Sequence, residues 1–313
     1  MVLPVDPPDE TRGMSKLDVE FSDDRTVVRL RGARHLDAAL LDGLDAALTR
    51  AESAAAPEIV FENAGPDFLV GIDAKWVVGR MVDDDFEAIR DFVREGQTFL
   101  QRLDETPLRT VARVRGHVTG AGAEWAATCD TVIAGADTKI GLPETGLGIH
   151  PALGGTQRVP RRIGYAAARW VILTGSYLSG AAARALGWVD ALEGEEVRHG
   201  TRPARVERAP LFGEGSRDAV LNAFAERTLD ELRNGPRPDD SVDVRRALQR
   251  LARRAPIALT VADSLLRHSL DDDFDRALEA EIDELATVYA TEDAMTGMRA
   301  GADGRRATRF QGR

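Results

Sequence analysis

The stretch VRGHVTGAGAEWAATCD, residues 114–130, decides the fold expected for this chain. It predicts a strand, a glycine-rich turn at Gly120-Ala121-Gly122 and a short apolar helix with Glu124 in its first turn. A glycine turn that enters a helix leaves backbone N–H groups unpaired at the positive end of the helix dipole. The turn is not a dinucleotide-binding fingerprint, because Trp125 stands where the third glycine should be.

A second turn of the same kind lies earlier in the chain, at Gly71-Ile72-Asp73-Ala74-Lys75, after the apolar residues 68–70. If one N–H group from each turn converged on one oxygen atom, the two turns would form an oxyanion hole. Taken alone, the Gly120-x-Gly122 pattern fits an ordinary tight turn better than a binding site.

Two glutamates accompany these turns. Glu124 follows the second turn, and Glu144 follows a proline in an otherwise apolar loop. Considered separately, each is more simply a helix N-terminal charge or a solvated acid. Together, two carboxyl groups beside an oxyanion hole are what acid–base chemistry next to a carbonyl requires.

Strand and helix patterns alternate on both sides of this stretch as far as residue 190, and the rest of the chain has only helical patterns. We therefore expect an α/β fold, with a disordered lead over 1–16, an α/β core over 17–190, a linker over 191–215 and a helical region over 216–313. Strands are predicted at 17–21, 26–30, 59–61, 109–114 and 131–134, and helices at 38–54, 83–103, 165–173, 179–186, 216–233, 242–254, 256–267 and 274–299.

Composition excludes several classes of protein. The 313 residues are 43% hydrophobic and 30% charged, which allows a full core, and no stretch of 18 apolar residues predicts a membrane span. The net charge of −11 disfavours a nucleic-acid binder. The single cysteine, Cys129, leaves no intramolecular disulfide and no cysteine-based zinc site, and the polar residues 1–16 show no secretory signal. A cytoplasmic protein is expected.

The stretch 114–130 and the stretch GLPETGLGIHPALGGTQR, residues 141–158, resemble the two signatures of the enoyl-CoA hydratase/isomerase (crotonase) family. The resemblance covers residues 17–190 well and 256–313 more loosely. It implies a crotonase-like spiral of ββα turns, with a helical C-terminal segment used in trimerisation. A homotrimer or a dimer of trimers (a hexamer) follows as an expectation.

The same resemblance implies an enzyme that acts on acyl-CoA thioesters and stabilises an enolate. Backbone N–H groups of Ile72 and Ala121 would form the oxyanion hole. Glu124 would orient or deprotonate water, and Glu144 would serve as the acid toward the α-carbon. Coenzyme A would be part of the substrate, and neither a metal nor another cofactor is implied. The positions matched to substrate or CoA binding are Gly71, Asp73, Lys75 and Gly120, of which Lys75 would lie near the phosphates and Asp73 would chiefly fix its turn.

Because both family glutamates are present, the leading hypothesis is an enoyl-CoA hydratase of fatty-acid β-oxidation, which adds water to a 2-enoyl-CoA to give a 3-hydroxyacyl-CoA. The alternatives are an acyl-CoA isomerase, a 3-hydroxyacyl-CoA hydrolase or a non-catalytic acyl-CoA-binding subunit on the same fold.

Three features depart from the family pattern. Ala121 replaces a glycine and would be strained at positive φ, Ala152 replaces the glycine after a proline, and residues 191–255 are longer than usual.

Overall fold

A six-stranded sheet forms the base of the α/β part of the molecule, with the strand order β1-β2-β3-β4-β6-β9. The computed structural model describes residues 15–54, 56–197, 218–271, 273–307 and 309–313. The first two strands pair antiparallel around residues 22–24, as predicted, and the other pairs are parallel. The strands are β1 (Leu17–Phe21), β2 (Thr26–Leu30), β3 (Glu58–Asn63), β4 (Arg109–Val114), β6 (Thr131–Ala134) and β9 (Ala191–Leu192).

A smaller sheet contains β5 (His117–Thr119), β7 (Lys139–Gly141) and β8 (Leu178–Ser179). The chain leaves the large sheet at the end of β4, enters the small sheet as β5 and continues into helix α5 (Ala121–Thr128). It then repeats the sheet-to-sheet step with β6 and β7. These successive turns are the spiral of ββα units that the sequence predicted, and they place the N-terminus of α5 at the end of a buried strand.

Helix α4 (Phe86–Glu105) covers this core. Asp85 caps its N-terminus by accepting a hydrogen bond from Ala88 N–H, and apolar side chains recur at helical spacing along its buried face. Phe99 of this helix meets the ring of Trp125 edge-on, with 5.8 Å between the ring centroids. The Trp125 side chain is therefore part of the core, and it holds α5 against α4.

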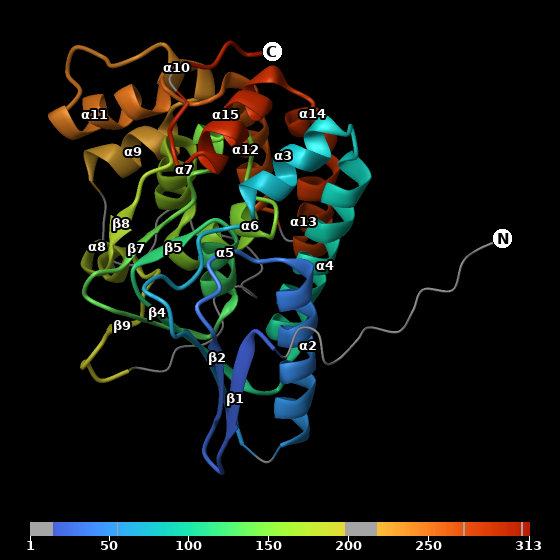
Figure 1. Cartoon of the computed structure of the whole chain (residues 1–313). Coiled ribbons are helices and arrows are strands. Elements are labelled where there is room, and N and C mark those ends of the chain that lie inside the picture. The colour runs from blue at the N-terminus through green and yellow to red at the C-terminus, as the bar shows by residue number, and fades with distance from the viewer. Residues whose placement is uncertain (1–14, 55, 198–217, 272, 308) are drawn as a thin grey trace.

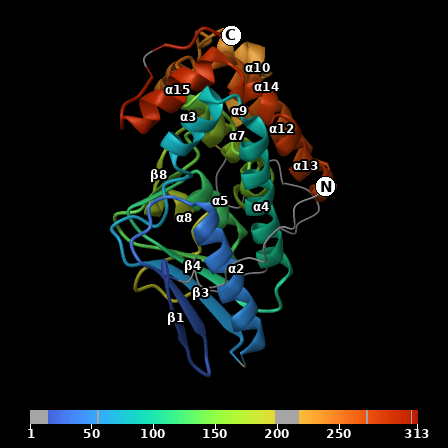
Figure 2. The same cartoon turned by 45° about the vertical axis from the view of Figure 1, so that its right-hand side comes forward.

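The C-terminal helices cover one end of the α/β part, where they are drawn orange to red in Figures 1 and 2. The predicted single helix over 274–299 is wrong, because the structure has three helices there: α13 (Phe274–Asp283), α14 (Leu285–Tyr289) and α15 (Glu292–Ala302). Thr291 caps the third of these, so the helix restarts at a residue whose side chain competes for backbone N–H groups. Helix α3 (Ala74–Val82), which the sequence analysis did not predict, packs against α15.

The segment predicted as a linker begins with an ordered strand. Ala191 and Leu192 pair with β6 at the edge of the large sheet. Most of the remaining linker, together with most of the predicted N-terminal lead, lies outside the described residues.

The other helices are α2 (Ala38–Ser53), η1 (Glu144–Gly146), α6 (Gly155–Ile163), α7 (Tyr165–Thr174), α8 (Gly180–Leu186), α9 (Ala219–Glu226), α10 (Leu229–Arg233), α11 (Val242–Leu251) and α12 (Pro256–His268).

Candidate active site

A cavity of about 420 Å³ lies between the N-terminus of α5, the short helix η1 and the C-terminal helices α14 and α15. Much of its wall is apolar, but ionisable or polar side chains from distant parts of the chain also border it. The buried ones with an ionisable side chain are Glu124, Glu144, His150 and Tyr289, and Arg34, His35 and Thr119 also border the cavity. A mainly apolar cavity with a few convergent polar groups is the usual form of a small-molecule site.

The two glycine turns meet at this cavity. Gly71 and Gly120 both have positive φ, and a Cβ atom on Gly120 would lie 3.2 Å from the Cα of Gly71 and 3.0 Å from Oε1 of Glu144. The next residue after each glycine, Ile72 or Ala121, has an N–H group that donates no hydrogen bond within the described part of the chain. Ala121 itself is not at positive φ, because Gly120 takes that conformation, so alanine is unstrained there.

Glu124 is 2% exposed on the first turn of α5. Its Oε1 atom accepts hydrogen bonds from the N–H groups of Leu153 at 2.8 Å and Gly155 at 2.9 Å. Burial raises the pKa of Glu124 to about 7, while these two hydrogen bonds and the charge of Arg158 act in the opposite direction. The carboxyl group is therefore balanced between its ionised and protonated forms near neutral pH.

Glu144, on η1, is 7% exposed, and its Oε2 atom is buried without a hydrogen-bond partner among the described residues. Burial raises the pKa of Glu144 well above its ordinary value, and the negative charges of Glu124 and Glu281 raise it further. Two N–H donors and the charge of Arg158 thus favour the ionised form of Glu124, whereas burial and two neighbouring negative charges favour the protonated form of Glu144. Unequal pKa values in a carboxyl pair distinguish a base from an acid.

Glu281, from α13, is a third buried carboxyl group beside the site, and the sequence analysis missed it. Burial and the Glu124 charge raise its pKa to about 8. Its backbone carbonyl accepts a hydrogen bond from Nε2 of the buried His150 at 2.9 Å, and burial lowers the pKa of this imidazole to about 4. One signal was available in the sequence: positions 274, 278, 281 and 285 recur at helical spacing, which places Glu281 on an otherwise apolar helix face.

Two of the predicted binding residues lie away from the cavity. Asp73 accepts a hydrogen bond from Lys75 N–H at 2.8 Å and so caps α3, and the exposed Lys75 side chain does not border the cavity.

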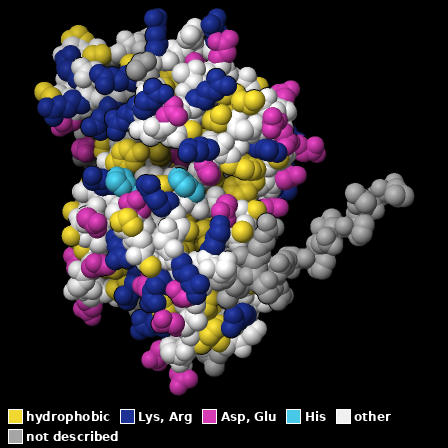
Figure 3. All heavy atoms as spheres, in the orientation of Figure 1, with side chains coloured by type: hydrophobic (Ala, Val, Ile, Leu, Met, Phe, Trp, Pro, Cys, Tyr) yellow, Lys and Arg dark blue, Asp and Glu magenta, His cyan; other side chains and the backbone are white. Residues whose placement is uncertain are grey.

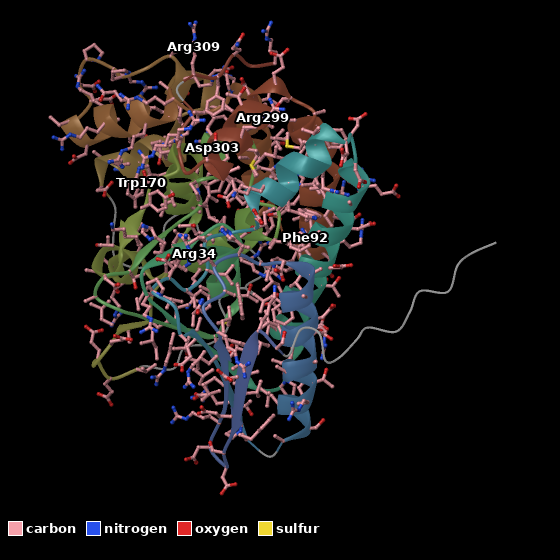
Figure 4. The ribbon with its side chains drawn as sticks, viewed as in Figure 1. Arg34, Phe92, Trp170, Arg299, Asp303 and Arg309 are labelled. Atoms are coloured by element: carbon pink, nitrogen blue, oxygen red, sulfur yellow. The ribbon has the colours of Figure 1, made fainter. Side chains whose placement is uncertain are left out.

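A second hollow, of about 620 Å³, adjoins the first and shares Arg34, His35 and Phe92 with it. Figure 4 labels Arg34, which follows β2, and Phe92 of α4. The two hollows together offer a long groove that passes Asp73.

An arginine cluster surrounds Arg254, whose charge interacts with those of Arg250, Arg253 and Arg306. Figure 3 shows Lys and Arg side chains gathered at the upper left, where α9–α11 lie. No cluster member forms an ion pair within the described ranges, and Arg254 donates only to the carbonyl of Thr174. Burial and the positive charge of Arg306 lower the pKa of Arg254. In a chain of net charge −11, these uncompensated cations favour an anionic ligand.

The described residues contain neither a metal-type cluster nor a membrane-type helix. No group of three or more His, Cys, Asp and Glu side chains there is arranged to hold a metal ion. No helix in those ranges combines the length and the apolar character that crossing a bilayer requires.

The spiral of ββα turns, with carboxyl groups facing two free backbone N–H groups, defines a crotonase-type enzyme. The chain belongs to the enoyl-CoA hydratase/isomerase family, whose model matches residues 29–209. The expected family and fold are confirmed, and this family acts on acyl-CoA thioesters.

Individual relatives carry several names. The chain is 30% identical to a fatty acid oxidation complex subunit alpha from Aliivibrio fischeri. The 245 aligned residues are 75% of this chain and 33% of that protein. It is 34% identical over 158 residues to a probable enoyl-CoA hydratase from Bacillus subtilis, covering 50% of this chain and 60% of the relative. The chain thus matches about a third of the first relative and less than two thirds of the second. A crystal structure of an enoyl-CoA hydratase from Rhodobacter sphaeroides has the same fold, with a TM-score of 0.77, 22% identity, and coverage of 95% of this chain and 93% of that one.

Proposed function

We propose that this protein is an enoyl-CoA hydratase that adds water to a 2-enoyl-CoA and yields a 3-hydroxyacyl-CoA. The observation that carries the proposal is the pairing of Glu124, whose Oε1 accepts two backbone hydrogen bonds, with Glu144, whose Oε2 has no partner among the described residues, at the cavity where the N–H groups of Ile72 and Ala121 lie. Hydration needs a base for water and an acid for the α-carbon at the same moment. Isomerisation of a double bond and hydrolysis of a thioester do not require both a base for water and an acid for the α-carbon. The presence of both glutamates therefore favours hydration.

In the proposed reaction, the thioester oxygen accepts hydrogen bonds from Ile72 N–H and Ala121 N–H. Ionised Glu124 takes a proton from water, the water oxygen bonds to the β-carbon, and the π electrons move toward the thioester oxygen. Protonated Glu144 then gives its proton to the α-carbon. The product gains an O–H group from water and one proton from Glu144, and the proton that Glu124 took from water moves to Glu144 before the next turnover.

The groove and the arginine cluster support a coenzyme A ester as the substrate. The second hollow extends the cavity toward Arg34 and Asp73, and the cluster adds positive charge for the phosphate groups. Contacts of Gly71, Asp73, Lys75 and Gly120 with this substrate are part of the proposal, as is a role in fatty-acid β-oxidation. Coenzyme A enters as part of the substrate, and the proposed steps use no other cofactor.

Two properties of the whole protein also stand as proposals. A homotrimer or a dimer of trimers is expected from the family resemblance, and light scattering on the purified protein tests it. A cytoplasmic setting is supported by Cys129, which is free and buried.

The deciding experiment follows the loss of ultraviolet absorbance as crotonyl-CoA is hydrated, in the wild type and in Glu124→Gln and Glu144→Gln. Both variants are expected to lose about 10²-fold or more in kcat, as the removal of a positioned acid or base predicts. Glu279→Gln is the matched control, because Glu279 is an exposed glutamate that pairs with Arg94 on the surface. A wild type that is inert with crotonyl-CoA overturns the proposal. Shift of a 3-enoyl-CoA double bond would then indicate an isomerase, thiol release a hydrolase, and ligand binding without turnover a binding subunit.

A further inference from the structure

Four successive backbone N–H groups at the start of α6 are divided between two glutamates. The N–H groups of Leu153 and Gly155 donate to Oε1 of Glu124, at 2.8 and 2.9 Å. Those of Gly154 and Thr156 donate to Glu281, at 2.6 and 3.0 Å. Within this four-residue segment, the first and third N–H groups therefore bind one carboxyl group and the second and fourth bind another. The two carboxyl groups belong to different helices, α5 and α13.

Glu281 is fixed by further contacts and does not border the cavity. Its side chain also accepts a hydrogen bond from the Thr156 hydroxyl, and Gln97 Nε2 lies 3.4 Å from Oε2. It is 0% exposed and is absent from the wall of the cavity that holds Glu124 and Glu144. A residue in this place does not touch a ligand in the cavity, so it can act on the chemistry through the segment that it binds and through its charge.

We propose that Glu281 is a positioning residue: by binding Gly154 and Thr156 it fixes the Leu153–Thr156 segment, so that this segment presents the N–H groups of Leu153 and Gly155 to Glu124. The inference rests on the proposed function, in which Glu124 is the base. If Glu281 could not accept these hydrogen bonds, two buried N–H groups would lack an acceptor and the segment would rearrange. A displacement of about 1 Å at a reacting group costs about 10²-fold in rate.

The surroundings of Glu281 define how a pH measurement must be interpreted. The titratable or charged groups that interact with it are Glu124 from α5, Glu144 from η1, Arg158 from α6 with its partner Asp104 from α4, and His150 from the preceding loop. A lost negative charge at Glu281 would lower the pKa of the neighbouring carboxyl groups. Weakened hydrogen bonds from Leu153 and Gly155 would raise the pKa of Glu124 instead. The two effects have opposite signs.

The test uses Glu281→Gln, because an amide nitrogen cannot accept a hydrogen bond and one of the two N–H groups then loses its acceptor. The expected result is a fall in kcat of about 10-fold to 10²-fold, with KM changed by less than about threefold. The acidic limb of the pH profile of kcat should also move to higher pH. Thr156→Val keeps the Thr156 N–H bond to Glu281 but removes the hydroxyl bond to Glu281 and the bond that this hydroxyl accepts from Gln157 Nε2. It should give a smaller change in the same direction. Glu279→Gln, two residues away on the same helix and exposed, should match the wild type.

Three results overturn the inference: an unchanged kcat in folded Glu281→Gln, a lower kcat with an unmoved pH profile, and an acidic limb that moves to lower pH. Amide hydrogen exchange separates this failure from failure of the proposed function. If the wild type hydrates no enoyl-CoA, the amides of residues 153–156 should still exchange faster in Glu281→Gln than in the wild type. Equal exchange in the two proteins would refute positioning whatever the reaction is.

Discussion

Gly71 and Gly120 approach so closely that a Cβ atom on Gly120 would lie 3.2 Å from the Cα of Gly71. Both residues have positive φ, which only glycine adopts without strain. The contact brings two turns, 49 positions apart in the sequence, to one point of the cavity wall. The N–H groups of Ile72 and Ala121 follow directly after this point and are therefore candidates for binding one oxygen atom.

Gly120→Ala should lower kcat for crotonyl-CoA by about 10²-fold to 10³-fold, the usual cost of losing an oxyanion-hole donor. The added methyl group meets the Gly71 backbone and Oε1 of Glu144, so the two turns must separate. Gly79→Ala on α3 is the control, since nothing lies within 4 Å of its added Cβ, and it should keep full activity. The prediction is tested by measuring kcat for crotonyl-CoA in the two variants. A fully active Gly120→Ala variant would refute the role of this turn in the oxyanion hole.

The rate of hydration should depend on pH through the two cavity glutamates. Glu124 must be ionised to accept a proton, and its pKa is about 7, so kcat/KM should fall by about tenfold per pH unit below that pH. Glu144 must be protonated, and its raised pKa places the loss of activity on the alkaline side. Glu124→Gln should lose the acidic limb from its residual activity. An acidic limb that persists in this variant would show that another group titrates there.

The buried ion pair between Arg158 and Asp104 should dominate the stability of the helix that follows the site. Their N–O distance is 2.7 Å, the Arg158 side chain is fully buried, and its guanidinium also donates to the carbonyl of Leu153. Arg158→Met should lower the free energy of unfolding by about 3–5 kcal/mol, because Asp104 stays buried without its arginine partner. Arg246→Met, which breaks an exposed pair with Asp243, should cost less than about 1 kcal/mol. Urea unfolding measures both, and equal losses would contradict the prediction.

The arginine cluster should contribute to binding the phosphate groups of coenzyme A. Arg306→Gln is expected to raise KM for a CoA ester severalfold, to leave kcat nearly unchanged and to weaken the salt dependence of kcat/KM. The matched control is Arg305→Gln, because Arg305 already pairs with Asp303. A pantetheine thioester, which lacks the nucleotide, should show no difference between these proteins. An equal rise in KM for both thioesters would instead indicate damage to the acyl cavity.

The sequence predicted the site best where the reactive residues and the glycines that determine the local fold lie in the same short stretch. Glu124 and Glu144 could be singled out because each lies beside a turn within a long signature, and the glycines of that signature also determine the local fold. Strands β1 and β2 were predicted at their observed bounds, since a short polar turn separates two short runs that contain apolar residues.

The sequence was least informative where the contact is long-range. Glu281 belongs to no motif, and only the packing of α13 against the start of α6 gives it a partner. Phe274, Leu278, Ile282, Leu285 and Tyr289 have helical spacing, and this stripe is equally compatible with core and with a trimer contact. The structure buries the last four side chains within the chain and leaves Phe274 partly exposed. Helix α3 escaped prediction because its exposed Trp76 and Val82 obscure the apolar periodicity.

The hydrogen bonds from Thr156 to Glu281 connect residues that are 125 positions apart in the chain. A ribosome therefore releases the whole spiral of ββα turns long before it releases α13. Until that helix docks, the N–H groups of Gly154 and Thr156 have no carboxyl group to bind, and the segment that orients Glu124 is incomplete. Gain of enzymatic activity during synthesis or refolding should accordingly lag behind formation of the sheets, and it would report the docking of the C-terminal helices.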